Sequence, residues 1–396
     1  MAEEADRNLA CEVREHGRRA PDAQPPLQVP LFKPPDLSRY AALLQEVLAS
    51  GQIAGGPNVA RFESALARYV GNPWTTTCGD VSSALTMCLF HAGVRPGDDV
   101  LLSPLVCLAT SCPVRNLFAN VVWCDIDPMS GNIDSDDIAR RITPRTKAVI
   151  LFHWAGNPAD LDPILQIGRH RRIAVIEDAG EALGAEYRGR KIGSTGSDYT
   201  VFSFYPNRHL TTIEGGAIAC AREADYESLR WLKRYGIHQP TFRDTAGEIN
   251  PSSDIPVAGW NSYMNHVGAT LGLAQMEHLP AMIARGQANG QYYDERLAGV
   301  PGVMSLRRPP MSRSAYWVYT FLAEKSDKLL FRLRSCGIQA SRVHLRNDLY
   351  SCFGAAKTPL PGVDRFARCC VSIPCGWWVS DADRSRIADI ICQEAT

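Results

Sequence analysis

IEDAGEALG (residues 176–184) and GSDYTVFSFYPNRHLTTIEGG (residues 196–216) are the two segments that decide the fold of this 396-residue chain. Each contains a short apolar run that is typical of a buried strand, and each run ends in a polar side chain, Asp178 in the first and Ser203 in the second. The carboxyl ends of parallel strands face the ligand crevice of an α/β sheet. We therefore expect both side chains to lie in one pocket, facing Arg208.

The spacing of these three residues matches a pyridoxal phosphate (PLP) site with one exception. Asp178 would keep the pyridine nitrogen protonated, and Ser203 would bind the phosphate. Five residues after the serine the pattern requires a lysine, because its neutral amine forms the imine with the aldehyde. Arg208 stands there instead, and a guanidinium stays protonated and offers no such nucleophile. The next residue, His209, is either structural or the group that moves protons.

Short, β-branched apolar runs alternate with helical stretches along most of the chain. The runs VLLSPLV, NVVWCDI, AVILFHW and IAVIEDA are bounded by turn residues, and helical segments such as 82–92 and 136–141 separate them. This alternation is typical of a parallel sheet with crossover helices. The sequence thus predicts an α/β fold.

The C-terminal part has a different pattern. A long amphipathic helix is expected at 267–283, and shorter strands and helices follow it at 316–321, 371–373 and 381–392. The domain organisation that we predict is a polar N-terminal tail at 1–30, a large α/β domain at 31–285 and a small α+β domain at 286–396.

Composition excludes several classes of function. Lys+Arg and Asp+Glu are balanced at 42 each, so the chain lacks the electrostatic footprint of a protein that binds nucleic acid or an anionic membrane. No stretch approaches a membrane-spanning length, and the first residues do not resemble a signal peptide. The 13 cysteines contain no CxxC pair, which argues against a metal site. We expect reduced thiols and a cytoplasmic protein.

Other polar residues have both a functional and a structural interpretation. Ser82 and Ser83 precede an apolar helix, whose N-terminus is either a phosphate cradle or a plain serine cap. Glu181 either lies near the phenolic oxygen of the cofactor or is a solvated helical residue. Asn261 and the run of Arg346, Asn347 and Asp348 are polar clusters in apolar settings, which alone more often form turns and salt bridges. Gly215 and Gly216 indicate a tight turn or a close backbone approach.

In their order and spacing, these segments resemble the DegT/DnrJ/StrS family of PLP-dependent sugar aminotransferases over residues 30–395. The segments that carry the resemblance include GQIAGGPNVARFESALARYVG, HAGVRPGDDVLLSPLVCLAT, HWAGNPADLDPI, IEDAGEALGAEYRGRKIGSTG, SFYP, GWNSYMNHVGATLGLAQMEHL and VHLRND…IPCGWW. The resemblance implies the PLP-dependent transferase fold type I, a homodimer, and a nucleotide-linked or cyclitol keto or amino sugar as substrate, often in antibiotic or glycan pathways.

The resemblance also implies roles for particular residues. The positions that match cofactor contacts are Ser82, Cys107, Asp178, Glu181 and Ser203. Asn261 lies on a segment that reaches the neighbouring subunit's cofactor phosphate. Arg346, Asn347 and Asp348 are the candidates for binding the substrate.

Several positions depart from the family pattern. Val81 and Ile213 stand where glycine is usual, and Tyr263 stands where arginine or histidine is usual. Cys107 falls where a ring-stacking side chain is expected, and Arg208 replaces the lysine. Several changes around one pocket indicate a site that has drifted or been repurposed.

Three functions are compatible with this pattern. The chain uses PLP or its amine form (PMP) noncovalently on a sugar or cyclitol, with Arg208 fixing an anion and His209 acting as base, for example in a dehydration. Alternatively, it is a non-catalytic partner or sensor associated with an active paralogue. In the third case it is a conventional aminotransferase with another amine, for which Lys191, in an exposed-looking GRKIG turn, is nearest in sequence.

Overall fold

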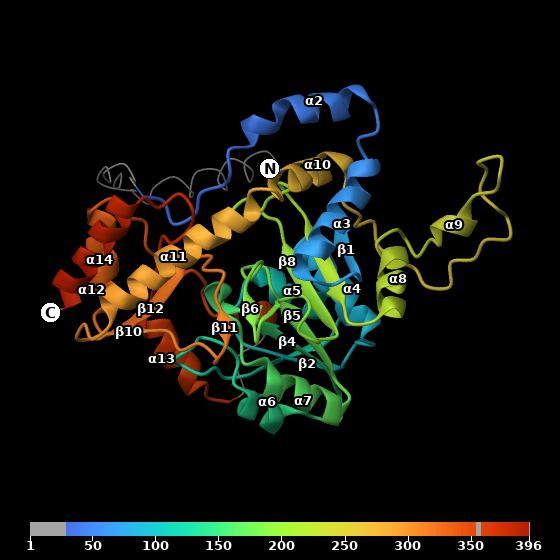
Figure 1. The fold of residues 1–396 in the computed structure, drawn as a ribbon. Coiled ribbons are helices and arrows are strands. Elements are labelled where there is room, and N and C mark those ends of the chain that lie inside the picture. The colour runs from blue at the N-terminus through green and yellow to red at the C-terminus, as the bar shows by residue number, and fades with distance from the viewer. Residues whose placement is uncertain (1–28, 354–357, 396) are drawn as a thin grey trace, which may run out of the picture.

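The computed structural model describes residues 29–353 and 358–395 and is built around a seven-stranded sheet (Figure 1). The strands follow the order β1 (Thr75–Cys78), β9 (Gly216–Cys220), β8 (Tyr199–Ser203), β5 (Ala174–Asp178), β4 (Thr146–Phe152), β2 (Asp99–Leu102) and β3 (Asn120–Trp123). Five neighbouring strands, from β8 to β3, run parallel, and β9 is antiparallel to both of its neighbours. The predicted α/β class is confirmed.

Side chains alternate along the strands between two hydrophobic cores, one on each face of the sheet. In β2, Val100 and Leu102 belong to one core and Leu101 to the other, and β4 alternates in the same way. The helices that precede, connect or follow the strands are α3 (Pro57–Val70), α4 (Val81–His91), α5 (Leu108–Asn116), α6 (Ser135–Arg141), α7 (Leu161–Arg171), α8 (Glu223–Leu232) and α10 (His266–Gln275). Sheet and helices together form a layered body with both faces of the sheet buried.

A second, smaller sheet forms near the C-terminus and is covered by two helices that pack on each other (Figure 1). It consists of β10 (Val303–Ser305), β12 (Tyr319–Ala323) and β13 (Cys370–Ile373), and its helices are α12 (Ser326–Ser335) and α14 (Asp381–Ala395). α13 (Pro361–Cys369) leads into β13. A third sheet of short strands contains β11 (Ser312–Arg313), β6 (Glu186–Tyr187) and β7 (Arg190–Lys191).

The helix predicted at 267–283 is wrong in its extent. The structure has two helices, α10 and α11 (Leu279–Leu297), because the chain turns after α10 and Pro280 lies in the first turn of the next helix. α11 contributes Leu279 and Ile283 to a core of the large sheet and Tyr293 to the core of the small sheet. The predicted domain boundary at 285 thus falls inside a continuous helix that joins the two cores.

The N-terminal boundary also differs slightly from the prediction. Val29, assigned to the polar tail, is buried and forms a parallel bridge with Ile338 beside the small sheet. The rest of the predicted tail lies outside the described residues. η1 (Leu37–Tyr40) and α2 (Ala41–Ala49) follow and lie across the top of the body in Figure 1.

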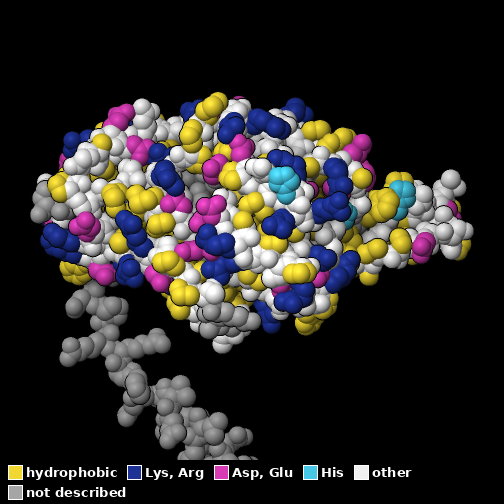
Figure 2. Space-filling model, turned by 90° about the horizontal axis from the view of Figure 1, so that it is seen from below, with side chains coloured by type: hydrophobic (Ala, Val, Ile, Leu, Met, Phe, Trp, Pro, Cys, Tyr) yellow, Lys and Arg dark blue, Asp and Glu magenta, His cyan; other side chains and the backbone are white. Residues whose placement is uncertain are grey.

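Two other features are visible from outside. The segment between α8 and α10 extends from the body as an arm that carries α9 (Gln239–Phe242). Basic and acidic side chains are interspersed over the face in Figure 2, as the balanced charge suggests. In the part of the chain that the structure describes, no helix is long and apolar enough to span a membrane, and the cysteines are free thiols.

Candidate active site

A cavity of about 670 Å³ lies beyond the carboxyl end of β8 and the N-terminus of α4. Its lining brings together three of the residues that the sequence singles out, Ser82, Ser203 and Arg208. Cys107 also lines it, at the residue before α5. Burial raises the pKa of the Cys107 thiol, and this side chain offers no aromatic face to a ligand.

Asp178, the last residue of β5, lies next to this cavity and is only 3% exposed. Its Oδ2 accepts a hydrogen bond of 2.5 Å from Thr110 Oγ1, and its Oδ1 accepts one of 3.0 Å from Gly180 N. Burial raises the pKa of Asp178, while the bond from Thr110 and the positive charge of Arg208 lower it in part. Thr110, which the sequence pattern did not indicate, therefore bonds a carboxyl group whose charged form is disfavoured by burial.

Arg208 is held by the protein itself. Its guanidinium lies over the Trp317 ring, 4.4 Å from the centroid, and NH1 is 3.4 Å from Glu181 Oε1. Glu181 is 1% exposed and also bonds Ala155 N through Oε2 at 2.9 Å and His344 Nε2 through Oε1 at 2.9 Å. The anion that Arg208 fixes in this structure is therefore a carboxylate of the chain.

His344 and Trp317 are functional candidates that the sequence did not indicate. Both line the cavity, and their rings stack with centroids 6.3 Å apart and planes at 14°. The Trp317 indole donates to Asn207 O at 2.6 Å and stacks on Phe32 from the N-terminal segment. Together these rings give the cavity an aromatic wall.

His209 occupies a different place from the one predicted. It does not contribute to the described lining, and its Nε2 lies 3.2 Å from the carbonyl oxygen of Ala315. Its Nδ1 is buried without a partner, and burial lowers the pKa of His209 to about 4. A neutral ring that bonds Ala315 and lies outside the described lining is poorly placed to move protons in the cavity.

The N-terminus of α4 already carries an anion. Asp80 is its N-cap: Oδ1 accepts from Ser83 N at 2.8 Å, and Oδ2 accepts from Ser83 Oγ at 2.6 Å. Ser82 Oγ is directed toward Ala109 O at 3.5 Å. Glu214 lines the cavity near Asp80, and burial together with the negative charge of Asp80 raises its pKa. Sequence reasoning identified the serines but missed both acids.

Glycines and their replacements shape the same end of the cavity. A Cβ on Gly216 would lie 3.0 Å from the carbonyl oxygen of Asp80, so the interpretation of a close backbone approach is confirmed there. Ile213 adopts φ 73°, in the left-handed region that disfavours β-branched side chains. Val81 is the first residue of α4 and places its side chain in the cavity lining.

The run Arg346, Asn347 and Asp348 does not contribute to the described lining. Arg346 forms two hydrogen bonds to Asp348, of 2.8 and 2.6 Å, and a further contact to Asp364. Asn347 Nδ2 donates to Ser111 Oγ at 2.7 Å. The structural interpretation describes these contacts better than substrate binding, since the polar atoms are used to attach this loop to α5 and α13.

Three further predicted positions lie away from the cavity. Lys191 Nζ lies over the Tyr69 ring, 3.6 Å from its centroid. The guanidinium carbon of Arg234 lies over the Tyr263 ring, 4.3 Å from its centroid. Asn261 is exposed beside the arm, where it forms a bridge with Arg234.

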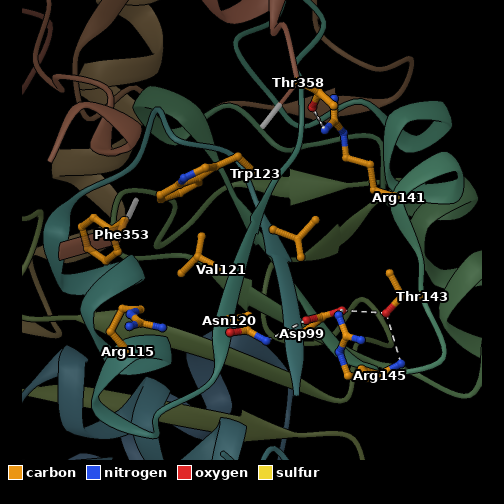
Figure 3. A pocket seen from close by; sticks show the side chains of 11 residues that line it. Asp99, Arg115, Asn120, Val121, Trp123, Arg141, Thr143, Arg145, Phe353 and Thr358 are labelled. Atoms are coloured by element: carbon orange, nitrogen blue, oxygen red, sulfur yellow. Dashed lines mark hydrogen bonds and ion pairs between the residues drawn. The ribbon is translucent and has the colours of Figure 1, made fainter. Parts of the chain in front are cut away.

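A second cavity, of about 410 Å³, lies against the edge strand β3 (Figure 3). Three arginines line it, but each is used by the fold. Arg145 pairs with Asp99 at 3.3 Å, Arg141 pairs with Asp137 at 2.5 Å, and Arg115 donates to Ala119 O at 2.9 Å. We therefore place the functional site at the first cavity.

Residues 37–392 match the DegT/DnrJ/EryC1/StrS aminotransferase family. The chain belongs to this family. It is 33% identical to GDP-perosamine synthase of Caulobacter vibrioides over 294 residues, 73% of this chain and 76% of that protein. It is 30% identical to the erythromycin biosynthesis sensory transduction protein EryC1 of Saccharopolyspora erythraea over 338 residues, which are 84% of this chain and 88% of that protein.

Solved structures of the family share its architecture. The sugar aminotransferase CalS13 of Micromonospora echinospora superposes with a TM-score of 0.86 and 33% identity, covering 92% of this chain and 100% of that one. AtS13 of Actinomadura melliaura superposes with a TM-score of 0.87 and 34% identity, covering 92% of this chain and 98% of that one. The fold is therefore that of the type I PLP-dependent transferases, as the sequence predicts.

The residues around the cavity fit only part of such a cofactor. Asp178 remains in position for a ring nitrogen, and Ser203 offers a hydroxyl to an anion. However, Arg208 provides no amine, and its guanidinium is held between Glu181 and Trp317. At the phosphate end, Asp80 and Glu214 place two carboxyl groups where an anion would bind. As a whole, the site does not fit PLP.

Proposed function

We propose that this chain binds a nucleotide-linked sugar or a cyclitol in the first cavity and does not carry out amino transfer. It would act as a non-catalytic partner or sensor in the pathway of an active family member. The observation that carries this proposal is the arrangement of Arg208, whose guanidinium replaces the amine and is held by Glu181 and Trp317. In the family, one relative is itself named a sensory transduction protein.

The cavity keeps features that suit a sugar. The stacked rings of Trp317, Phe32 and His344 form an apolar wall, and Ser203, Asn207 and Glu214 supply hydrogen-bonding groups around it. A few convergent polar groups on a largely apolar surface are typical of small-molecule sites.

Two measurements on the purified protein test the proposal. With PLP and glutamate we expect no conversion to the pyridoxamine form, followed by absorbance. With GDP-mannose and dTDP-glucose as probes, we expect calorimetric binding of at least one, and a loss of at least tenfold in affinity in Trp317→Ala. Phe331→Ala, which removes an exposed ring on α12, is the matched control. Amino transfer at family-like rates, or no binding of either probe, would contradict the proposal.

A second candidate is an enzyme that holds PLP or PMP noncovalently. The retained, buried carboxyl group of Asp178 favours it. In that case His344 is a better proton-moving group than His209, because it lines the cavity and bonds Glu181 at 2.9 Å. Saturable PMP binding that Asp178→Asn abolishes would support this candidate over the first.

We also infer that the chain forms a homodimer. Exposed apolar side chains occur on α2, at Leu43 and Leu48, and on the arm, at Ile249 and Ile255. The exposed Asn261 lies beside this arm, where it can reach a second copy. Light scattering at micromolar concentration should give twice the 43.5 kDa chain mass, and a monodisperse monomer would refute the inference.

The free thiols in the described ranges are in keeping with a reducing, cytoplasmic location, which we include in the proposal.

A further inference from the structure

We propose that the end of the cavity at α4 excludes phosphate, because the chain's own carboxylate at Asp80 occupies the anion position of this helix. The proposal deepens the function proposed above, on which it rests, by specifying that a ligand presents no phosphate to this end. The residues at this end of the cavity do not fit a phosphate-bearing cofactor.

The first step is the occupation of the helix terminus. The first amides of a helix and its dipole attract negative charge. In α4 both carboxylate oxygens of Asp80 are bound there, one by Ser83 N at 2.8 Å and one by Ser83 Oγ at 2.6 Å. A phosphate that approached Val81 and Ser82 would meet this negative charge directly beside it.

The second step is the charge of the surrounding wall. Glu214 and Asp80 both line this cavity, and burial together with the negative charge of Asp80 raises the pKa of Glu214. Among the described lining residues Arg208 is the one arginine, and there is no lysine. The guanidinium of Arg208 lies against Glu181 and Trp317, so the carboxylate of Glu181 already offsets part of its positive charge.

The third step is steric. Gly216 brings the start of β9 against the backbone of Asp80, where even a Cβ would lie at 3.0 Å from the carbonyl oxygen. The backbone of Asp80 thus lies close against the start of β9, while its carboxylate is fixed by the two bonds from Ser83.

The experiment compares ligands that differ only in phosphate. PMP and pyridoxamine are titrated into the full-length protein by calorimetry, and we expect pyridoxamine to bind at least tenfold more tightly than PMP. Asp80→Asn removes the charge and keeps the cap, since asparagine caps helices as well as aspartate does. We expect this variant to shift the affinity ratio at least tenfold toward PMP.

Asp134→Asn is the matched control, because Asp134 caps α6 through Asp136 N at 2.9 Å and lies outside the described lining. It should leave the ratio unchanged. Tighter binding of PMP than of pyridoxamine by the wild type would overturn the proposal, as would an unchanged ratio in Asp80→Asn. Failure of Asp80→Asn to bind PMP would also overturn it, because exclusion would then have another cause, and so would a wild type that binds neither ligand. Failure of the proposed function would instead appear as amino transfer from glutamate.

Discussion

Replacing Arg208 with lysine returns an amine to the position where the family pattern has one, and we expect a loss of stability without amino transfer. The guanidinium lies 4.4 Å from the Trp317 centroid and 3.4 Å from Glu181 Oε1. Lysine keeps the charge but loses the planar group that stacks on the indole.

The size of the loss follows from these two contacts. A cation–π contact of this kind contributes about 1 kcal/mol, and a long hydrogen bond to a charged group contributes about 1 kcal/mol at most. Glu181 keeps its bonds from Ala155 N and His344, both at 2.9 Å, so its carboxylate is not left unpaired. We therefore expect Arg208→Lys to lower the free energy of unfolding by about 1–2 kcal/mol, below the loss typical of an orphaned buried charge.

Urea unfolding at pH 7.5 measures the stability, and absorbance with PLP and glutamate follows the half-reaction. Arg230→Lys is the control, because Arg230 forms an exposed ion pair with Glu227. This substitution should change the free energy of unfolding by no more than about 0.5 kcal/mol. A variant as stable as the wild type would show that Arg208 is not held as described. Robust formation of the pyridoxamine form would show that the rest of the site is intact and refute the repurposed-cavity account.

Three further changes test the structure elsewhere. Lys233→Met should lower the free energy of unfolding in urea by about 2–3 kcal/mol, because it removes the 3.0 Å contact of Lys233 Nζ to the half-buried Glu63, which keeps its bonds from Thr76 and Thr77. His209 has a pKa of about 4 in the folded state against 6.5 ordinarily, so the unfolded chain binds its proton first as pH falls. Stability should therefore decrease between pH 6.5 and 4, by about 2 kcal/mol at pH 5, and His209→Gln should remove that part. Ile213→Gly relieves the strain at φ 73° and should raise stability by about 1 kcal/mol, seen as a higher Tm; a decrease would contradict the assigned strain.

The sequence predicts the sheet and the convergence of Ser203 and Arg208 from local patterns, whereas the family resemblance places Ser82 at the site. Apolar runs mark the strands, and the carboxyl ends of parallel strands meet at one edge. The predicted helix at 267–283 runs across the turn between α10 and α11. The apolar spacing continues through this turn, and the prediction follows that spacing although Pro280 indicates a new helix start.

Other parts of the site carry weaker signals. His344 is 163 residues from Glu181 in sequence, and nothing local connects them; the contact depends on how the C-terminal part folds back. The direction of His209 depends on the turn after β8, which residue type does not reveal. Asp80 did carry a signal, since an aspartate three residues before Ser83 at a helix start is typical of an N-cap.

Borohydride reduction after incubation with PLP tests most directly the central claim that this family member forms no imine with the cofactor. Intact mass spectrometry should then show the unmodified chain, because Arg208 has no amine to react and Lys191 Nζ lies against Tyr69. A lysine-bearing member of the family, treated in parallel, confirms that the reduction works. A stoichiometric pyridoxyl adduct on any lysine of this chain would contradict the account.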